Sequence, residues 1–256
     1  MRRPIALVAF LALAGAACVL SGKAEAPDVA PTAVANPLAE GLTAAAPVAT
    51  VPPSATPTPV NTTQLTPPTP VTTSSIDETI DSFGAVTVVT TSYITRYALI
   101  GETASDLESY MRTYGPPDSV GNRWYALTDP RFNWEISCAC DDLGCVAGSV
   151  TAYVSIDYTL PTWEPPYGAD VNLVAKWNDF ERALVLHERG HGDLASICGQ
   201  QLGEAFVALP PQPTCDAVKN AALEASNAIF AGCRAAQAQY EDETNHGMNE
   251  GVIWPP

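Results

Sequence analysis

The alternation of apolar and polar residues predicts β-strands in the first part of a folded region. Residues 85–101, 122–129, 131–137 and 148–161 are rich in Val, Ile, Thr and Tyr, as strands are. Asp-Pro at 129–130 predicts a turn, so the second and third segments are expected to form a hairpin. Short strands separated by turn signals predict a small antiparallel sheet.

The pattern becomes helical elsewhere. Helices are expected over residues 103–115, about 170–209 and about 214–240, where apolar residues recur at i, i+3 and i+4 spacing. Gly115 ends the first helix, prolines end the second, and Thr214 is the expected N-cap of the third. The short proline-rich connection predicts that the last two helices are antiparallel. The expected fold class is therefore α+β, with a small antiparallel sheet and one helix, followed by a C-terminal antiparallel helix pair.

The N-terminus predicts export from the cytoplasm. Two arginines precede an apolar run over residues 5–20, which is typical of an export signal over residues 1–23 and short for a membrane span. Cys18 follows Gly-Ala-Ala, which resembles a bacterial lipoprotein cleavage box, so a lipidated Cys18 would tether the protein to a membrane. Cleavage after Ala16 or Ala26 is the alternative, and it would release the protein.

Residues 24–75 are rich in Pro, Ala and Thr and show neither a helical nor a strand period. Such a composition cannot assemble a packed core, so this segment is expected to be a disordered spacer. The folded domain is then expected to cover residues 76–256. Its predicted location is extracellular or in the cell envelope.

The chain contains seven cysteines, an odd number that needs an explanation in an exported protein. Setting Cys18 aside leaves six, which in an oxidising compartment predicts three disulfides rather than a thiolate metal site. Six cysteines allow 15 connectivities, and the sequence does not choose among them. The six are Cys138, Cys140, Cys145, Cys198, Cys215 and Cys233.

Charge excludes one large class of partner. The chain has 12 basic and 28 acidic residues, for a formal net charge of −16. An acidic surface of this kind repels phosphate backbones, so nucleic acid is not expected as a partner. The sequence does not define the oligomeric state.

The segment "VLHERGHGD" contains the pattern H-E-x-x-H at residues 187–191. On a helix, His187 and His191 project from one face and can bind one zinc ion, while Glu188 faces a water molecule. A catalytic zinc site needs three protein ligands and one open position. Gly190 and Gly192 weaken a helix, and we expect them to make room for substrate or for a neighbouring strand.

The third ligand is not obvious from the spacing. The metzincin pattern is excluded because Leu194 and Ile197 occupy the positions of its glycine and third histidine. A helical glutamate, Glu204 or Glu224, is one possibility, and the remaining histidine, His246, is another. Counting residues at about 1.5 Å each, the last helix passes the level of the motif by about 12 Å, and a loop can then fold back.

Two separate motifs resemble a bacterial family catalogued as domain of unknown function 922, described as predicted secreted zinc-dependent proteases. Its pattern combines H-E-x-x-H with a later Y-D-x-x-T-x-H-G segment, and this chain has "YEDETNHG" at residues 240–247, with Glu241 at the aspartate position. The segment "YTLPTWEPP" also resembles the family sequence before the active-site helix. The resemblance covers about residues 93–251, nearly the whole expected domain.

The resemblance implies a zincin-like metallopeptidase that acts on peptide or protein substrates. Zinc would be held by His187, His191 and His246, and Glu188 would be the general base. Tyr240 would donate a hydrogen bond to the oxyanion of the tetrahedral intermediate, or would be a core aromatic residue without a catalytic role.

Three further expectations accompany this interpretation. Asp193 would orient one of the zinc-binding histidines, or would be a solvated helix carboxylate. The first alternative function is a non-catalytic, exported zinc-binding or interaction module. The second is an amidase that cuts amide bonds in cell-wall peptides, which would use the same ligands.

Overall fold

A computed structural model describes residues 18–22, 32–33, 70–71, 76–119 and 121–255 of the chain. The export signal and the spacer fall largely outside these residues, so both stay predictions. Within the described ranges, no helix is long and apolar enough to cross a membrane.

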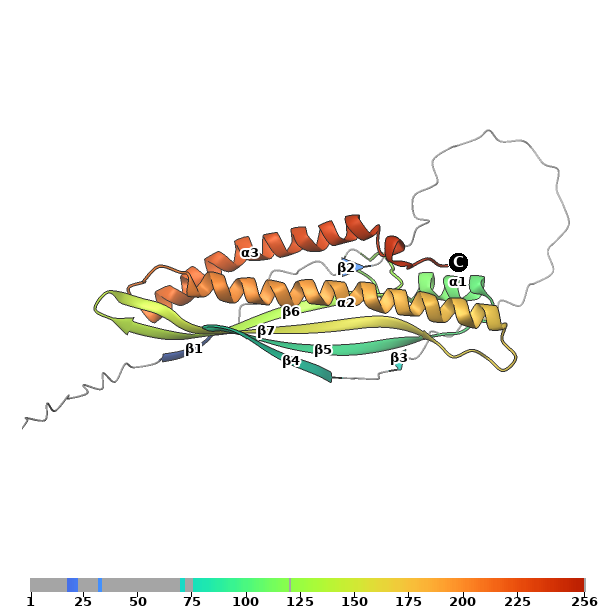
Figure 1. The fold of residues 1–256 in the computed structure, drawn as a ribbon, viewed down its shortest axis with the longest axis horizontal. Coiled ribbons are helices and arrows are strands. Elements are labelled where there is room, and N and C mark those ends of the chain that lie inside the picture. Colours follow the sequence, from blue (N-terminus) through green and yellow to red (C-terminus); the bar gives the residue numbers. More distant parts are fainter. Residues whose placement is uncertain (1–17, 23–31, 34–69, 72–75, 120, 256) are drawn as a thin grey trace, which may run out of the picture.

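Four long strands form most of a single sheet, in the order β6-β7-β5-β4 (Figure 1). They are β4 (Ile76–Phe83), β5 (Val86–Leu99), β6 (Leu127–Asp141) and β7 (Gly144–Trp163). Short strands extend its sides: β1 (Cys18–Gly22) and β2 (Thr32–Ala33) pair with β6, and β3 (Pro70–Val71) pairs with β5. The sheet is mixed, because β5 and β7 are parallel while β6–β7 and β4–β5 are antiparallel. The prediction of an antiparallel sheet is therefore wrong for its central pair.

The predicted hairpin at Asp129-Pro130 is also wrong. Pro130 lies inside β6 and pairs with Ile156, and the turn comes after Asp141, whose side chain accepts a hydrogen bond from Leu143 N at 2.8 Å. Among the described residues, β1 and β2 pair with other parts of β6 and leave Pro130 without a strand on that side. A proline is tolerated there because no second ladder needs its missing N–H.

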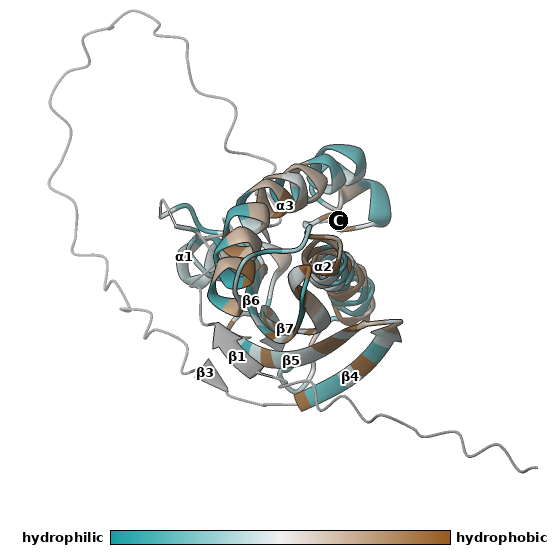
Figure 2. Ribbon diagram, turned by 90° about the vertical axis from the view of Figure 1, so that its left-hand side faces the viewer, coloured by the Kyte–Doolittle hydropathy of each residue, from teal (hydrophilic) through white to brown (hydrophobic). Residues whose placement is uncertain are grey.

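The three predicted helices are present, and the α+β character is confirmed. They are α1 (Ala104–Tyr114), α2 (Val171–Val207) and α3 (Cys215–Thr244), and the 3₁₀ turn η1 (Met248–Glu250), which was not predicted, follows. The side chains of Thr103, Asp170 and Thr214 cap the three N-termini by accepting backbone hydrogen bonds. Helices α2 and α3 lie on the same side of the sheet, with α2 along β7 and β5 (Figure 2).

Glycines allow α2 to approach the sheet closely. A Cβ atom at Gly199 would meet Val154 Cγ2 at 2.6 Å, and one at Gly203 would meet the side chain of Val86, whose Cβ would be 3.3 Å away. Both valines are β-branched and cannot turn aside easily. These small residues therefore set the distance between the helix and β5 and β7, and with it the position of the H-E-x-x-H segment.

Replacing Gly203 by alanine is expected to destabilise the protein by about 1–3 kcal/mol, because the added methyl overfills the interface with Val86. Gly232 on α3 is the matched control, since a Cβ there meets nothing within 4 Å. Gly232→Ala should stabilise the protein by up to about 1 kcal/mol through helix propensity. Urea unfolding measures both changes, and equal effects at the two positions would contradict the packing argument.

The six described cysteines of the folded domain form three disulfides, as the cysteine count predicts. Cys138–Cys215 joins β6 to the start of α3, Cys140–Cys145 closes the β6–β7 hairpin, and Cys198–Cys233 joins α2 to α3. The last bond fixes which residues of the two helices lie side by side.

Candidate metal centre

Helix α2 directs His187 and His191 toward α3, four residues apart on one face. Both side chains are fully buried, and their Nε2 atoms lie 3.2 Å apart. The four-residue spacing therefore brings the Nε2 atoms of the two rings to one point.

The opposite ring nitrogens are both hydrogen-bonded to acceptors. His187 Nδ1 lies 2.8 Å from Glu250 Oε2, and His191 Nδ1 lies 2.7 Å from Gln237 Oε1. The Gln237 amide orientation is defined because its Nε2 donates to the His191 carbonyl at 3.0 Å. Each Nδ1 is therefore placed to donate to its acceptor, and in the neutral form of each ring the Nε2 atom then carries the lone pair.

Glu241 brings a carboxylate to the same point from α3. Its Oε2 lies 3.6 Å from His187 Nε2, and its Oε1 lies 3.3 Å from His191 Nε2. The residue is buried, and Oε1 accepts no hydrogen bond. Burial raises the pKa of Glu241, but its contacts with the two histidines outweigh this and lower it to about 2.

The charge of Glu241 acts on His187 in return. Burial lowers the pKa of His187, but the hydrogen bonds to Glu241 and Glu250 and their negative charges outweigh it and leave the pKa above its ordinary value. The electrostatic field at this point therefore favours a positive charge.

These three groups fit a zinc ion. His187, His191 and Glu241 each offer a ligand atom, and the three atoms lie within 4.8 Å of one another. Two atoms bonded to one tetrahedral zinc ion at about 2.0–2.1 Å are themselves about 3.3 Å apart, close to the separations found here. A proton on one Nε2 atom would be shared with a single neighbouring acceptor, whereas a divalent cation can contact all three groups.

His246 lies beside this cluster and is not one of its three members. Its Nδ1 is 3.1 Å from Glu241 Oε2, its side chain is 41% exposed, and its ring faces Trp124 at a centroid distance of 6.4 Å. Its backbone is left-handed, with φ of 54°, as is that of Asn245. The assignment of His246 as the third ligand stays a prediction, and the structure offers Glu241 in that position.

The other carboxylates considered from sequence lie elsewhere. Glu204 and Glu224 are exposed and outside the cluster. Asp193 is exposed as well, and the hydrogen bonds that orient the two histidine rings come from Gln237 and Glu250 instead.

Tyr240 supports the ring of His187. The two rings stack at a centroid distance of 5.1 Å and an interplanar angle of 15°, and the tyrosine hydroxyl lies 3.2 Å from both carboxylate oxygens of Glu250. Gly190 admits this tyrosine, because a Cβ there would collide with its hydroxyl. Gly192 likewise admits Tyr158 of β7. The expectation that one glycine makes room for a neighbouring strand is therefore confirmed at Gly192.

Glu188 is fully buried on the side of α2 that faces the sheet. Its Oε2 accepts a hydrogen bond from the Thr128 hydroxyl on β6, and its Oε1 has no partner among the described residues. Burial raises the pKa of Glu188 to about 7, with a further rise from the charge of Glu241 and opposing effects of His191 and Thr128. A carboxylate held by one oxygen, with the other free, can exchange a proton.

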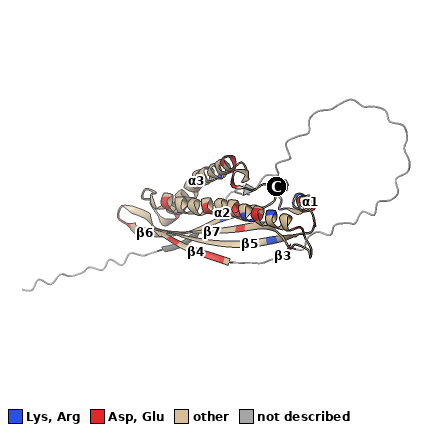
Figure 3. Ribbon diagram, turned by 45° about the vertical axis from the view of Figure 1, so that its right-hand side comes forward, with Lys and Arg blue, Asp and Glu red and all other residues tan. Residues whose placement is uncertain are grey.

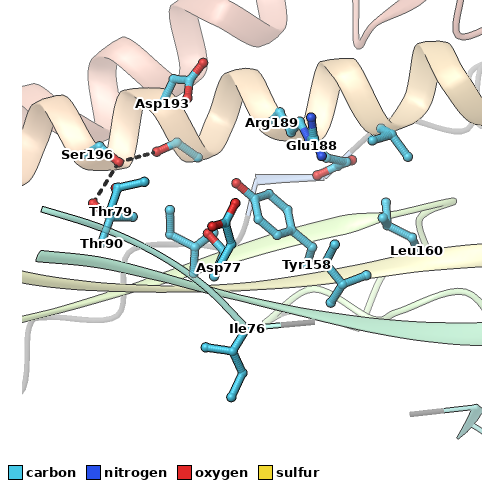
Figure 4. Close-up of a pocket in the computed structure, with 15 residues that line it drawn as sticks. Ile76, Asp77, Thr79, Thr90, Tyr158, Leu160, Glu188, Arg189, Asp193 and Ser196 are labelled. Atoms are coloured by element: carbon cyan, nitrogen blue, oxygen red, sulfur yellow. Dashed lines mark hydrogen bonds between the residues drawn. The ribbon is translucent and has the colours of Figure 1, made fainter. Parts of the chain in front are cut away.

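A cavity of about 600 Å³ opens beside Glu188, between α2 and the strands β4, β5 and β7 (Figure 4). Its lining mixes hydroxyl, carboxyl and aliphatic side chains. Tyr158 and Asp77 both lie in the space between the strands and the helix (Figure 4). The cavity is therefore large enough for the side chain of a bound molecule next to Glu188.

Sequence reasoning missed the residues that orient the site: Thr128, Gln237 and Glu250. Gln237 and Glu241 are four residues apart on α3, which is the spacing of two side chains on one helix face. That spacing repeats the one between the two histidines on α2. The spacing of Gln237 and Glu241 could have indicated that they face the two histidines, but only if the relative placement of α2 and α3 were already known.

Comparisons with known proteins gave one match. A family model described as bacterial protein of unknown function (DUF922) matches residues 94–247. Searches of the curated proteins and of the solved structures found no match. The matched region runs from within β5 to the loop after α3, so it contains Glu188 and all three members of the metal cluster.

Proposed function

The chain belongs to the bacterial family of unknown function DUF922, and from its metal centre we propose that it is a zinc-dependent peptidase. The observation that carries this proposal is the convergence of His187 Nε2, His191 Nε2 and a Glu241 oxygen on one buried point, while both Nδ1 atoms are hydrogen-bonded to other acceptors. Glu188 extends the proposal from metal binding to hydrolysis. Binding a metal does not need this carboxylate, whereas hydrolysis needs a base beside the metal.

In the proposed mechanism, His187, His191 and Glu241 hold the zinc ion. Zinc bound there would polarise the scissile carbonyl and lower the pKa of a water molecule to about 7. Glu188 accepts the proton of the attacking water on its free Oε1 and passes it to the departing amine. The Thr128 hydrogen bond holds the other oxygen and fixes the direction of the carboxylate.

The surrounding residues keep the ligands in place. Gln237 and Glu250 hold the protons on the Nδ1 atoms, so both Nε2 atoms remain available to the metal. Tyr240 supports the His187 ring by stacking and binds Glu250 through its hydroxyl. We therefore propose a positioning role for Tyr240 in place of the oxyanion contact expected from the family resemblance.

The fold and the proposed site also bear on location. We propose that the domain works outside the cytoplasm, anchored to the envelope or released. Its three disulfides support this, since such bonds form and persist in oxidising compartments.

Removal and return of the metal tests the proposed function. The purified chain should contain about one zinc per molecule, hydrolyse members of a broad peptide library, lose this activity with a chelator and regain it on addition of zinc. Mass-spectrometric detection of new peptide termini measures the cleavage. Stoichiometric zinc without cleavage of any peptide would favour the non-catalytic zinc-binding module instead.

A further inference from the structure

The cavity beside Glu188 has a regular construction. Strand pairing places the residues of its floor side by side: Asp77 on β4 pairs with Ser92 on β5, and Ser92 pairs with Ile156 on β7. All three line the cavity, as does Tyr158 two residues further along β7, on the same face of the strand. The roof is the flank of α2. The open side therefore lies at the edge strand β4, and the inner end lies at the buried Glu188.

The aliphatic part of the lining suits a hydrocarbon stem. Ile94, Ile156 and Leu160 contribute from the strands, and Val185 contributes from α2. A long side chain that enters from the site at Glu188 would cross these groups before it reaches β4. Lysine and arginine bury such stems on apolar surfaces while their charged ends stay near water.

The polar end of the cavity is acidic. Strand β4 carries acidic residues along its length, as the red segments of Figure 3 show. Asp77 lines the cavity and makes no hydrogen bond or ion pair with the described part of the chain. Arg189 and Asp193 at the rim on α2 carry opposite charges. The net charge of the cavity lining therefore depends on Asp77 and Glu188, and a carboxylate at either position favours a bound cation.

A second feature points to a ligand independently of the charge at β4. Glu188 is fully buried and lines the cavity, yet its Oε1 has no hydrogen-bond partner within the described ranges. A native structure seldom leaves a buried carboxylate oxygen without a donor unless a ligand or water supplies one. The cavity is thus the place from which a bound molecule reaches this oxygen.

We propose that this cavity binds the side chain of a lysine or arginine residue of the substrate, next to the bond that is cut. The aliphatic stem lies along Ile156 and Val185, and the cationic end reaches Asp77. The inference rests on the proposed peptidase function, because it assigns the cavity to the substrate of that same site.

Paired peptides test the proposal with the full-length, zinc-loaded chain. Each pair differs at one position, with lysine in one member and uncharged norleucine of similar length in the other, and the position is moved along the peptide. At the best position, kcat/KM for lysine should exceed that for norleucine by about two- to fivefold, the range for a solvent-exposed ion pair. The ratio should fall as salt is added.

Two variants separate the cavity from general charge effects. Asp77→Asn should bring the lysine-to-norleucine ratio close to one. Asp81→Asn removes the same charge from the same strand, but Asp81 does not line the cavity, so the wild-type ratio should remain. A wild-type ratio near one at every position, or an equal loss in both variants, would overturn the proposal.

A binding measurement distinguishes failure of this inference from failure of the proposed peptidase function. If neither peptide series is cut, peptidase function fails, and fluorescence anisotropy of the same labelled peptides on the metal-free full chain decides the cavity. Tighter binding of lysine peptides that Asp77→Asn removes would support the cation site. Equal binding of both members, or no binding, would overturn it.

Discussion

The Glu188→Gln variant is expected to keep its zinc and lose about 10²- to 10⁴-fold in kcat, the usual contribution of a general base. Glutamine has nearly the same shape and can still accept the Thr128 hydrogen bond, so the fold and the metal ligands should persist. What it lacks is a basic oxygen at the position of Oε1, which has no other partner in the structure. Zinc content by elemental analysis and kcat with the best library peptide measure the two properties.

Asp179→Asn is the control for this variant. Asp179 is an exposed carboxylate on the same helix, paired with Arg182 at 3.1 Å and remote in sequence from the motif. Its removal should leave kcat within about twofold, as expected for an exposed ion pair of little energetic weight. If Glu188→Gln kept most of the wild-type kcat with zinc bound, Glu188 would not be the base.

Removal of Glu241 is expected to have the largest effect on metal affinity. Glu241→Ala deletes one of three ligands, so zinc should bind more than about 100-fold more weakly, beyond the range for residues that only support a ligand. His246→Ala removes a group that contacts Glu241 Oε2 at 3.1 Å, so its effect should stay within about 10- to 100-fold. Competition with a zinc-binding dye measures both affinities.

Glu243→Ala provides the matched control, because Glu243 is an exposed glutamate on the same helix two residues further on. Its zinc affinity should equal that of the wild type. The opposite order, with His246→Ala the more damaging change, would restore the assignment of His246 as third ligand that the family resemblance implies.

The helices and one half of the site could be predicted from sequence because both depend on local spacing. Apolar periodicity and capping residues define α1, α2 and α3 to within a few residues, except that α3 extends from the expected Tyr240 to Thr244. The spacing of His187 and His191 places both on one helix face whatever the rest of the chain does. Local patterns decide these features, so local reasoning recovers them.

The other half of the site depends on the offset of α3 along the axis of α2, which no local sequence pattern specifies. The Cys198–Cys233 bond shows the offset: Cys198 lies nine residues before the end of α2 (207 − 198), but Cys233 lies 18 residues after the start of α3 (233 − 215). If the end of α2 and the start of α3 are assumed to lie at the same level, counting residues places the histidines beside the wrong part of α3. This offset brings Gln237 and Glu241 to the histidines instead.

The sheet shows the same limit. The sequence of β5 and β7 predicts strands but carries no information on whether they run parallel. That direction depends on the order of strands in the assembled sheet, where β7 lies between β6 and β5. Asp129-Pro130 predicts a turn because proline usually ends a strand. The position of Pro130 in β6 depends on which neighbours that strand lacks, and this is a property of the assembled sheet.

The central claim is that His187, His191 and Glu241 hold a zinc ion. A crystal of the zinc-loaded chain, measured on both sides of the zinc absorption edge, tests it most directly. The account predicts one anomalous peak within about 2.0–2.2 Å of both Nε2 atoms and a Glu241 oxygen. A peak bound by His246 in place of Glu241, or no peak between the histidines, would contradict it, as would a sole peak at the cysteine cluster of Cys138, Cys140, Cys145 and Cys215.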